Sequence, residues 1–550
     1  MNDSLNSTGT NRRNIILLLL ILPVLQSVIG LIAHFEYGYF YQRITDPEYF
    51  HLLNGINVAI FNLATPYIDH PGTPLQVIVA VSSWPVSLFI PGSIVENAID
   101  QPELFITAAI ILMSIIISGV LFYAGKKVYS YTGNIFMTLL IQLIPFGNIY
   151  AFSVFGRLTP ESFMIAPILL TVVILIRYLY NETEEKISRK ELLYLSLLGG
   201  FGMAIKFSYL PFLLIPIFII KRFPLLIKYG VYTILSTLIF AFPILFNFSK
   251  AFNWFGNMLI KSGQWGDGQE VFINWVDVPN NLRLIFNMNY FLPILTIIVL
   301  VLIIVTSVKS LKETQKLNRI SSGVLLAILL SVFLITKHFA FRYYFPTLLF
   351  QAVLLVLIIE YLARLFQNFL SKKKLSLVIL AFFFGFILYQ TPAYIKKVKD
   401  TSIEYKLYDQ HSESFTNSIV DPAPLIIDSY FAGSPFIEFS LNNAYLLCGN
   451  LKTTFQDKLR KDYPNSFFYV RWSDQFFHWN HFLDADSFID KDNGAYLFIG
   501  EENENNKKII IDRISSSFPQ YNIETHVVYE TTNPKESLYR VSLTQKNINH

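Results

Sequence analysis

The sequence contains little charge: only 15% of its 550 residues are Asp, Glu, Lys or Arg, and 53% are hydrophobic. A soluble protein usually has about a quarter charged residues. The formal net charge is only +4, and no basic block alternates with aromatic residues as in many nucleic-acid-binding proteins. We therefore expect most of the chain to lie in a lipid bilayer and no nucleic acid to be a partner.

Cysteine and phosphate-binding glycine motifs are also scarce. Cys448 is the single cysteine, so neither an internal disulfide nor a thiolate metal cluster can form. The stretch GGFGMAIK, residues 199–206, lacks the Walker spacing and lies within an apolar span. The sequence therefore offers neither a disulfide framework nor a P-loop.

Long apolar runs recur along the first 391 residues. A membrane-crossing helix needs about 20 apolar residues. The runs predict an α-helical polytopic membrane protein with about 11 transmembrane helices, near 14–33, 104–124, 133–152, 160–180, 192–205, 209–220, 225–246, 290–306, 322–336, 343–363 and 375–391.

Two apolar stretches are less regular. Residues 192–220 form two short spans or one long span, depending on a hinge at Lys206. Residues 74–91 contain Pro85 and lie between acidic loops, so we expect an interfacial or re-entrant helix there.

The first apolar run follows Arg12 and Arg13, as in a signal peptide. No clear small-x-small cleavage site follows it, and a run of about 20 residues is long for a signal peptide. We interpret it as a retained first transmembrane helix. A cytoplasmic N-terminus places most loop lysines and arginines inside, so the C-terminus is expected outside the cell membrane.

The composition changes after about residue 392. Short β-rich runs, namely PLIIDSYFAGSPFIEFSL, FFYVRW, AYLFIG, KKIIIDRI and SLYRVSL, alternate with polar segments. About 150 residues suffice for one small α/β domain. We therefore expect a transmembrane domain at 1–391, with a first outer loop at 34–103, and an extracytoplasmic α/β domain at 392–550.

With this topology, unusual polar residues gather on the outer side. Ionisable residues at membrane depth tend to line a site or a pathway. The candidates from four outer segments are Glu36, Asp46, Glu48, His51, Asp69, His70, Arg157, Glu161, Lys206, Lys337 and Arg342. A fifth outer segment, the loop 247–289, contains KSGQWGDGQE.

Each of these residues also has a simpler interpretation. Asp46 before Pro47 is a good helix start, in which the carboxylate caps the helix. DHPGTPLQ can be a tight turn, and GRLTPES can be a turn with an ion pair between Arg157 and Glu161. The lysines and Arg342 can be snorkelling side chains at helix ends.

The order of these motifs resembles a known family. DPEYFHLLNG and DHPGTPLQ are similar to the acidic pair and the His-Pro-Pro turn of polytopic glycosyltransferases of the GT-C superfamily, which includes protein O-mannosyltransferases and aminoarabinose transferases. GRLTPESFMIAPILL, GGFGMAIKFSYLPFLLIP, KHFAFRYYFPTLL and LIIDSYFAGSPFIEFSL resemble later segments of the family in the same order.

The resemblance implies transfer of a sugar from a polyprenyl-phosphate donor to an outer acceptor with inversion. Asp46, or second Glu48, would be the base, because a positioned carboxylate can take the proton of the acceptor. Lys337, Arg342, Lys206 and Arg157 would stabilise the leaving phosphate. His70, Asp69, Glu161 and His51 would support the site.

The sequence departs from the family pattern at two positions. Pro47 separates Asp46 from Glu48, and Gly72 replaces the second proline of the turn. Asp46, Glu48, Asp69 and His70 could also bind a divalent metal ion, which the sequence leaves open. The acceptor, whether lipid, polysaccharide or protein, is not identified.

Two other functions fit part of the pattern. A transporter or flippase of lipid-linked sugars would share the outer charges, but would more often show inverted halves with broken helices, and no internal symmetry is visible. A non-enzymatic membrane binding protein would depend on its C-terminal domain rather than on the carboxylates of the first loop.

Overall fold

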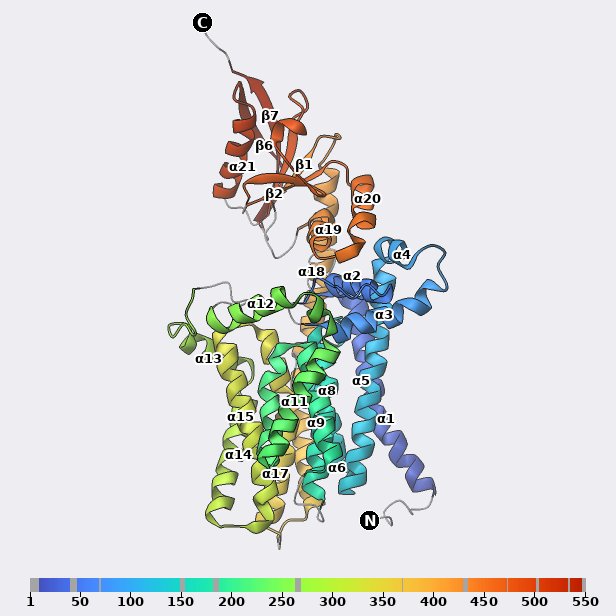
Figure 1. The fold of residues 1–550 in the computed structure, drawn as a ribbon, viewed down its shortest axis with the longest axis vertical. Coiled ribbons are helices and arrows are strands. Elements are labelled where there is room, and N and C mark those ends of the chain that lie inside the picture. The colour runs from blue at the N-terminus through green and yellow to red at the C-terminus, as the bar shows by residue number, and fades with distance from the viewer. Residues whose placement is uncertain are drawn as a thin grey trace.

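A bundle of long helices and a smaller domain above one of its ends make up the molecule (Figure 1). The computed structural model describes residues 9–39, 47–68, 71–148, 154–181, 187–262, 269–367, 369–428, 434–471, 473–500, 504–532 and 535–546. We call the end of the bundle that faces the C-terminal domain the domain end. The N-terminus lies at the opposite end (Figure 1).

Eight helices of the described chain are long and apolar enough to cross a membrane. One of them, α8, is central, because 89% of its apolar window is buried, against 22% for α1. The eight are α1 (Gly9–Tyr37), α5 (Pro102–Thr132), α8 (Pro160–Tyr180), α11 (Phe223–Phe240), α14 (Phe291–Val308), α15 (Gln315–Lys337) preceded by η6 (Lys312–Thr314), α17 (Gln351–Leu365) preceded by η7 (Phe341–Tyr344) and α16 (Phe345–Leu348), and α18 (Lys372–Asn417).

The predicted number of about 11 spans is not confirmed. The other three predicted spans are helical but short, namely α6 (Ile135–Gln142) with η3 (Ile144–Phe146), α9 (Arg189–Ile205), and η4 (Phe207–Leu213) with α10 (Leu214–Ile219). Lys206 is extended, with φ −163° and ψ 138°, and separates α9 from η4. The predicted hinge at Lys206 therefore divides residues 192–220 into two short segments.

Short helices cover the domain end of the bundle (Figure 1). They are α2 (Glu48–Ala59), α3 (Thr73–Ser87), α4 (Ile94–Asp100) and α12 (Phe248–Ile260), and α13 (Val278–Met288) follows. Helix α3 starts after Gly72, whose φ of +66° favours glycine, and has proline in its first turn. It corresponds to the predicted segment 74–91 and lies across this end of the bundle (Figure 1).

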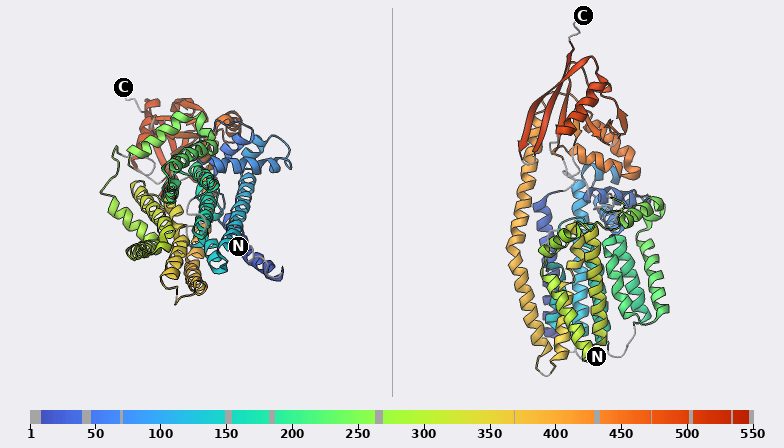
Figure 2. Two further views of the ribbon diagram at one scale, coloured as in Figure 1. Left: turned by 60° about the horizontal axis from the view of Figure 1, so that its bottom comes forward. Right: turned by 90° about the vertical axis from the view of Figure 1, so that its left-hand side faces the viewer.

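Helix α18 joins the bundle to the C-terminal domain. It has 46 residues and runs along the bundle from the opposite end into the domain (Figure 2, right). The predicted boundary at residue 392 falls inside this helix. Pro392 is accommodated within α18, and the helix continues to Asn417.

The C-terminal domain contains a seven-stranded sheet of order β4-β3-β2-β1-β5-β7-β6. The central strand β1 (Leu425–Asp428) pairs in parallel with β2 (Ser466–Val470) and β5 (Ala495–Ile499). The remaining pairs are antiparallel and involve β3 (Gln475–His478), β4 (His481–Leu483), β6 (Tyr521–Thr532) and β7 (Lys535–Gln545). The fold is therefore a helical membrane bundle with a small α/β domain, as predicted.

One predicted β-rich run is wrong. KKIIIDRI, residues 507–514, belongs to helix α21 (Glu504–Ser517). Ile510 and Ile514 are four residues apart and completely buried in the core of the domain, so they share one face of a helix. Likewise, PFIEFSL after β1 is not extended, because residues from Ile437 form α19 (Ile437–Leu446).

The first-loop helices pack directly against the C-terminal domain. The Asn54 Nδ2 of α2 donates to Leu447 O at 3.0 Å, and Asn57 Nδ2 donates to Cys448 O at 2.8 Å. Lys458 of α20 (Lys452–Asp462) lies 2.8 Å from Asp100 of α4. Helix α2 is therefore held between the bundle and the domain.

Candidate active site

The first charged pair of the site joins α2 to the segment before α8. Glu48 is completely buried, and its Oε2 lies 3.8 Å from Nη1 of Arg157, which is also buried. The backbone N–H of Leu158 donates to Glu48 Oε1 at 3.3 Å. Arg157 Nη1 donates to Gly38 O at 2.8 Å. Glu48 thus ties the start of α2 to Arg157 and to the backbone beside it.

Two tyrosine rings also lie beside Arg157. The guanidinium lies 4.9 Å from the ring centre of Tyr37 and 5.7 Å from that of Tyr405. These are distances at which a cation is attracted to the face of an aromatic ring. Tyr405 belongs to α18, so this cluster connects three parts of the chain.

The second charged pair joins α8 to the break between α9 and η4. Lys206 Nζ contacts Glu161 Oε1, and the two side chains are 4% and 5% exposed. The same Nζ lies 4.8 Å from the ring centre of Tyr343. The sequence left open an ion pair between Arg157 and Glu161 within one turn. In the structure, Arg157 pairs with Glu48 and Glu161 pairs with Lys206 instead.

His51 lies on α2 and is completely buried. Neither ring nitrogen has a hydrogen-bond partner among the described residues. Burial, with a smaller effect of the Lys206 charge, lowers the pKa of His51 to about 3. A Cβ on Gly72 would lie 2.6 Å from Cε1 of His51, so glycine allows the turn before α3 to pass close to this ring.

An apolar groove of about 180 Å³ lies beside the second charged pair. It is lined mainly by apolar side chains from η4, α12 and α15, among them Phe207, Trp254 and Leu334. Phe207 and Trp254 stack with ring centres 5.6 Å apart. Lys206 and Lys337 are the two ammonium groups in its lining, and we call it the Lys206–Lys337 groove.

Lys337 ends α15 and is held against the end of α12. Its Nζ donates to Met258 O at 2.9 Å and to Leu259 O at 2.6 Å. His338 Nε2 lies 2.7 Å from the same Met258 oxygen. Lys337 Nζ is also 4.4 Å from the ring centre of Phe272. Lys337, which could have been a snorkelling side chain, is thus buried and donates to two backbone carbonyls.

Arg342 lies in η7 and is half-buried. It does not belong to the lining of the Lys206–Lys337 groove. Its guanidinium lies 5.7 Å from the ring centre of Tyr343, whose ring also contacts Lys206 and lines the groove. Tyr343 therefore lies close to both Arg342 and Lys206.

Three predicted site residues, Asp46, Asp69 and His70, lie outside the described residues. Their predicted roles stay predictions. Within the described ranges, no group of three or more His, Cys, Asp or Glu residues is placed to hold a metal ion. The possible metal site of Asp46, Glu48, Asp69 and His70 rests mainly on residues outside those ranges.

Sequence reasoning did not identify Tyr343, His338, Tyr405 or Trp254 as parts of the site. Tyr343 and His338 stand next to Arg342 and Lys337, so proximity to a predicted cation was the only signal for them. Tyr405 lies beyond the predicted domain boundary, and only the continuity of α18 brings it to Arg157.

Comparison with solved structures finds proteins of similar fold. No protein-family model and no curated protein matches the sequence. The chain is similar in structure to the crystal structure of ArnT from Cupriavidus metallidurans bound to undecaprenyl phosphate, with a TM-score of 0.51 and 10% sequence identity. The likeness covers 97% of this chain and 98% of that chain. It confirms the predicted GT-C resemblance at the level of the fold.

Proposed function

We propose that this protein is a membrane glycosyltransferase that moves a sugar from a polyprenyl-phosphate donor to an acceptor at the domain end. The observation that carries the proposal is the Lys206–Lys337 groove, in which two buried ammonium groups border a mainly apolar lining. A phosphate attached to a long apolar chain needs this combination of charge and apolar surface. The fold shared with ArnT, which was crystallised with undecaprenyl phosphate, supports the same donor class.

The leaving phosphate would be stabilised by Lys206 and Lys337. Transition-state charge is stabilised best by groups already held in position. Glu161 and Tyr343 hold Lys206, and two backbone carbonyls hold Lys337. Arg342 also lies beside the Tyr343 ring, and a guanidinium can bind a phosphate with two parallel hydrogen bonds.

The base is assigned to Asp46, with Glu48 in a positioning role. Glu48 already accepts from Leu158 N and faces Arg157, and its side chain is completely buried. In the sequence, Asp46 is separated from Glu48 only by Pro47, and Glu48 is the first residue of α2. Arg157, predicted as a phosphate ligand, would serve instead to hold Glu48.

The proposed reaction is a single displacement with inversion. The acceptor hydroxyl or amine gives its proton to Asp46 while its oxygen or nitrogen forms a bond to the anomeric carbon. The bond from that carbon to the phosphate oxygen breaks, and the electron pair leaves with the polyprenyl phosphate.

The orientation follows from the distribution of positive charge. Six lysines and arginines line one pocket at the opposite end of the bundle, where the N-terminus also lies. Short cytoplasmic loops are enriched in these residues. We therefore place the domain end, with the groove and α2, on the extracytoplasmic side of the cell membrane.

The decisive experiment measures polyprenyl-phosphate release by the purified protein from a panel of polyprenyl-phosphate sugars, with candidate acceptors present. Wild type and Asp100→Asn should release the carrier from one donor, and Asp46→Asn should not. Asp100 is a matched control, because it is an exposed carboxylate at the same end that pairs with Lys458.

Two outcomes would contradict the proposal. Equal release by wild type and Asp46→Asn would overturn the assignment of the base. Movement of the intact donor across vesicles without release of the carrier would indicate a flippase. Repeating the assay with a chelator tests whether a metal ion is needed, because removal of a required divalent ion would stop release.

A further inference from the structure

A second large cavity lies at the opposite end of the bundle, away from the site described above. Its volume is about 770 Å³, and it is lined by ends of α8, α15, α17 and α18 and by the segments between helices. The lining contains six cations and only two carboxylates. We call this cavity the basic pocket, and its cations are Lys221, Lys312, Lys316, Arg319, Arg364 and Lys372.

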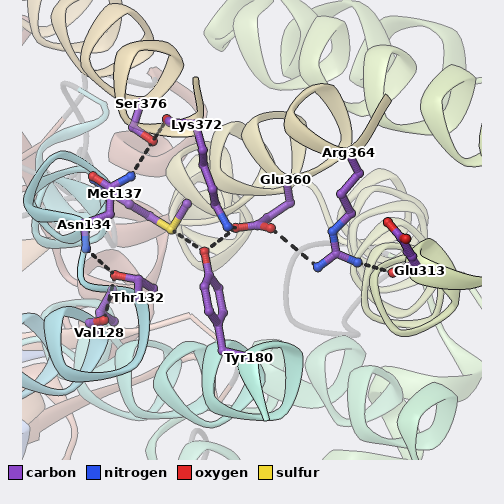
Figure 3. Close-up of polar contacts among 10 residues, drawn as sticks. All are labelled: Val128, Thr132, Asn134, Met137, Tyr180, Glu313, Glu360, Arg364, Lys372 and Ser376. Atoms are coloured by element: carbon purple, nitrogen blue, oxygen red, sulfur yellow. Dashed lines mark hydrogen bonds and ion pairs between the residues drawn. The ribbon is translucent and has the colours of Figure 1, made fainter. Parts of the chain in front are cut away.

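One carboxylate of the basic pocket, Glu360, is already neutralised within the protein (Figure 3). It is 1% exposed, its Oε1 lies 2.7 Å from Lys372 Nζ, and its Oε2 lies 3.5 Å from Arg364 Nη2. The hydroxyl of Tyr180 donates to Glu360 as well. Glu360 therefore orders Lys372 and Arg364 at the wall of the pocket.

Two of the other cations have no partner in the described part of the chain. Lys312 and Arg319 line the pocket, yet neither makes a hydrogen bond or an ion pair with any described residue. Lys316, which lies between them in sequence, donates to the backbone oxygen of Asn181. Six cations and two carboxylates leave an excess of positive charge among the lining residues, so an anion in the pocket would reduce the repulsion between the cations.

The general enrichment of positive charge in cytoplasmic loops does not explain the pocket. That enrichment requires lysines and arginines at this end, but not their convergence on one cavity. Lys373 and Lys374 show the simpler case: they begin α18 at the same end, are exposed, and do not line the pocket. The donor chemistry proposed above does not use the pocket either.

We propose that the basic pocket binds a phosphate-bearing anion, and that its place at the ends of membrane helices fits the headgroup of an anionic phospholipid. Basic pockets between transmembrane helices on the cytoplasmic side are suited to such headgroups. Leu179 and Leu370 in the lining offer apolar contact beside the cations. The assignment to the inner leaflet rests on the proposed orientation, whereas phosphate binding itself does not depend on the proposed function.

The test uses the full-length protein, purified in neutral detergent. Its melting temperature and retained lipid, the latter by native mass spectrometry, are measured with dioleoylphosphatidylglycerol, dioleoylphosphatidylcholine or inorganic phosphate. The variant Lys312→Gln/Arg319→Gln removes two cations that hold no described partner, so it should fold. The control Lys373→Gln/Lys374→Gln removes the same charge from the same end of the molecule.

Phosphatidylglycerol should raise the melting temperature of the wild type and the control, and phosphatidylcholine should not. The Lys312→Gln/Arg319→Gln variant should need about 30-fold more phosphatidylglycerol for the same rise, since two cations near a membrane surface contribute about 1 kcal/mol each. If inorganic phosphate reproduces the effect with the same dependence on the variant, the ligand is a soluble phosphate. If it does not, the ligand is the lipid headgroup.

Two results would overturn the proposal. One is an equal loss of the lipid effect in both double variants, which would indicate diffuse surface charge. The other is the absence of any effect of phosphatidylglycerol and phosphate on the wild type. The connection after Asn181 contains Glu182, Glu184 and Glu185, outside the described residues, and the second result would be expected if these carboxylates supplied the countercharge instead.

Discussion

Glu48 Oε2 lies 3.8 Å from Arg157 Nη1, and both side chains are buried. Removing one partner of a buried ion pair leaves an uncompensated charge and typically costs about 3–5 kcal/mol, whereas replacing both by apolar or neutral groups costs much less. We therefore expect Glu48→Gln and Arg157→Met each to lower the melting temperature of the purified protein strongly. The double variant should be more stable than the sum of the single changes predicts. Additive effects would mean that the two residues are not coupled.

The pair of Lys206 and Glu161 allows stability and function to be separated. Lys206→Met should destabilise the protein, because Glu161 stays buried without its partner. Adding Glu161→Leu should restore most of the melting temperature. It should not restore transfer, if Lys206 stabilises the leaving phosphate. The measurement is polyprenyl-phosphate release by both variants. Recovery of release in the double variant would reduce Lys206 to a structural role.

His51 should make stability depend on pH. Its pKa is lowered to about 3 in the folded protein, from an ordinary value of 6.5. Between these values the unfolded chain binds the proton and the folded protein does not. The stabilisation is therefore complete above about pH 6.5 and decreases as the pH falls, by about 1.4 kcal/mol per pH unit.

His51→Phe provides the control for this effect, because the histidine ring makes no hydrogen bond with described residues. We expect the melting temperature of the wild type to fall more steeply than that of His51→Phe between pH 6.5 and 5. Other groups titrate equally in both proteins. Parallel curves would show that His51 is not buried in its neutral form.

Filling the Lys206–Lys337 groove should weaken donor binding. Ser331 is buried, lines the groove, and its hydroxyl has no partner among the described residues. Ser331→Leu adds apolar bulk there and loses no hydrogen bond, so we expect a severalfold higher KM for the lipid donor and little change in melting temperature. Leu329→Phe is the control, because Leu329 is 59% exposed on the outside of the same helix. An unchanged KM in Ser331→Leu would argue against this groove as the donor site.

The helical bundle could be predicted because its signal is local. Apolar runs long enough to cross a bilayer appear directly in the sequence, and the break at Lys206 follows from a lysine inside one of them. The error at 507–514 has the opposite cause. The three consecutive isoleucines 509–511 have strong β propensity. Ile510 and Ile514, however, are four residues apart and lie on the helix face that packs in the core of the domain.

The partners of the charged residues could not be predicted in the same way. Glu161 has Arg157 four residues before it, but pairs with Lys206, 45 residues away. Arg157 instead faces Glu48, on another helix. These choices depend on how α2, α8 and α9 pack, which local pattern does not specify. The sequence did place all of these residues on one end of the bundle.

The length of helix α18 sets the distance between the C-terminal sheet and the membrane. Its 46 residues span about 69 Å at about 1.5 Å each, more than twice the hydrocarbon core of about 30 Å. Because one uninterrupted rod reaches from Lys372 beside Glu360 to the sheet, the domain cannot swing on a flexible tether. The helix therefore fixes the distance between the sheet and the membrane, and the acceptor of the proposed reaction would have to fit within it.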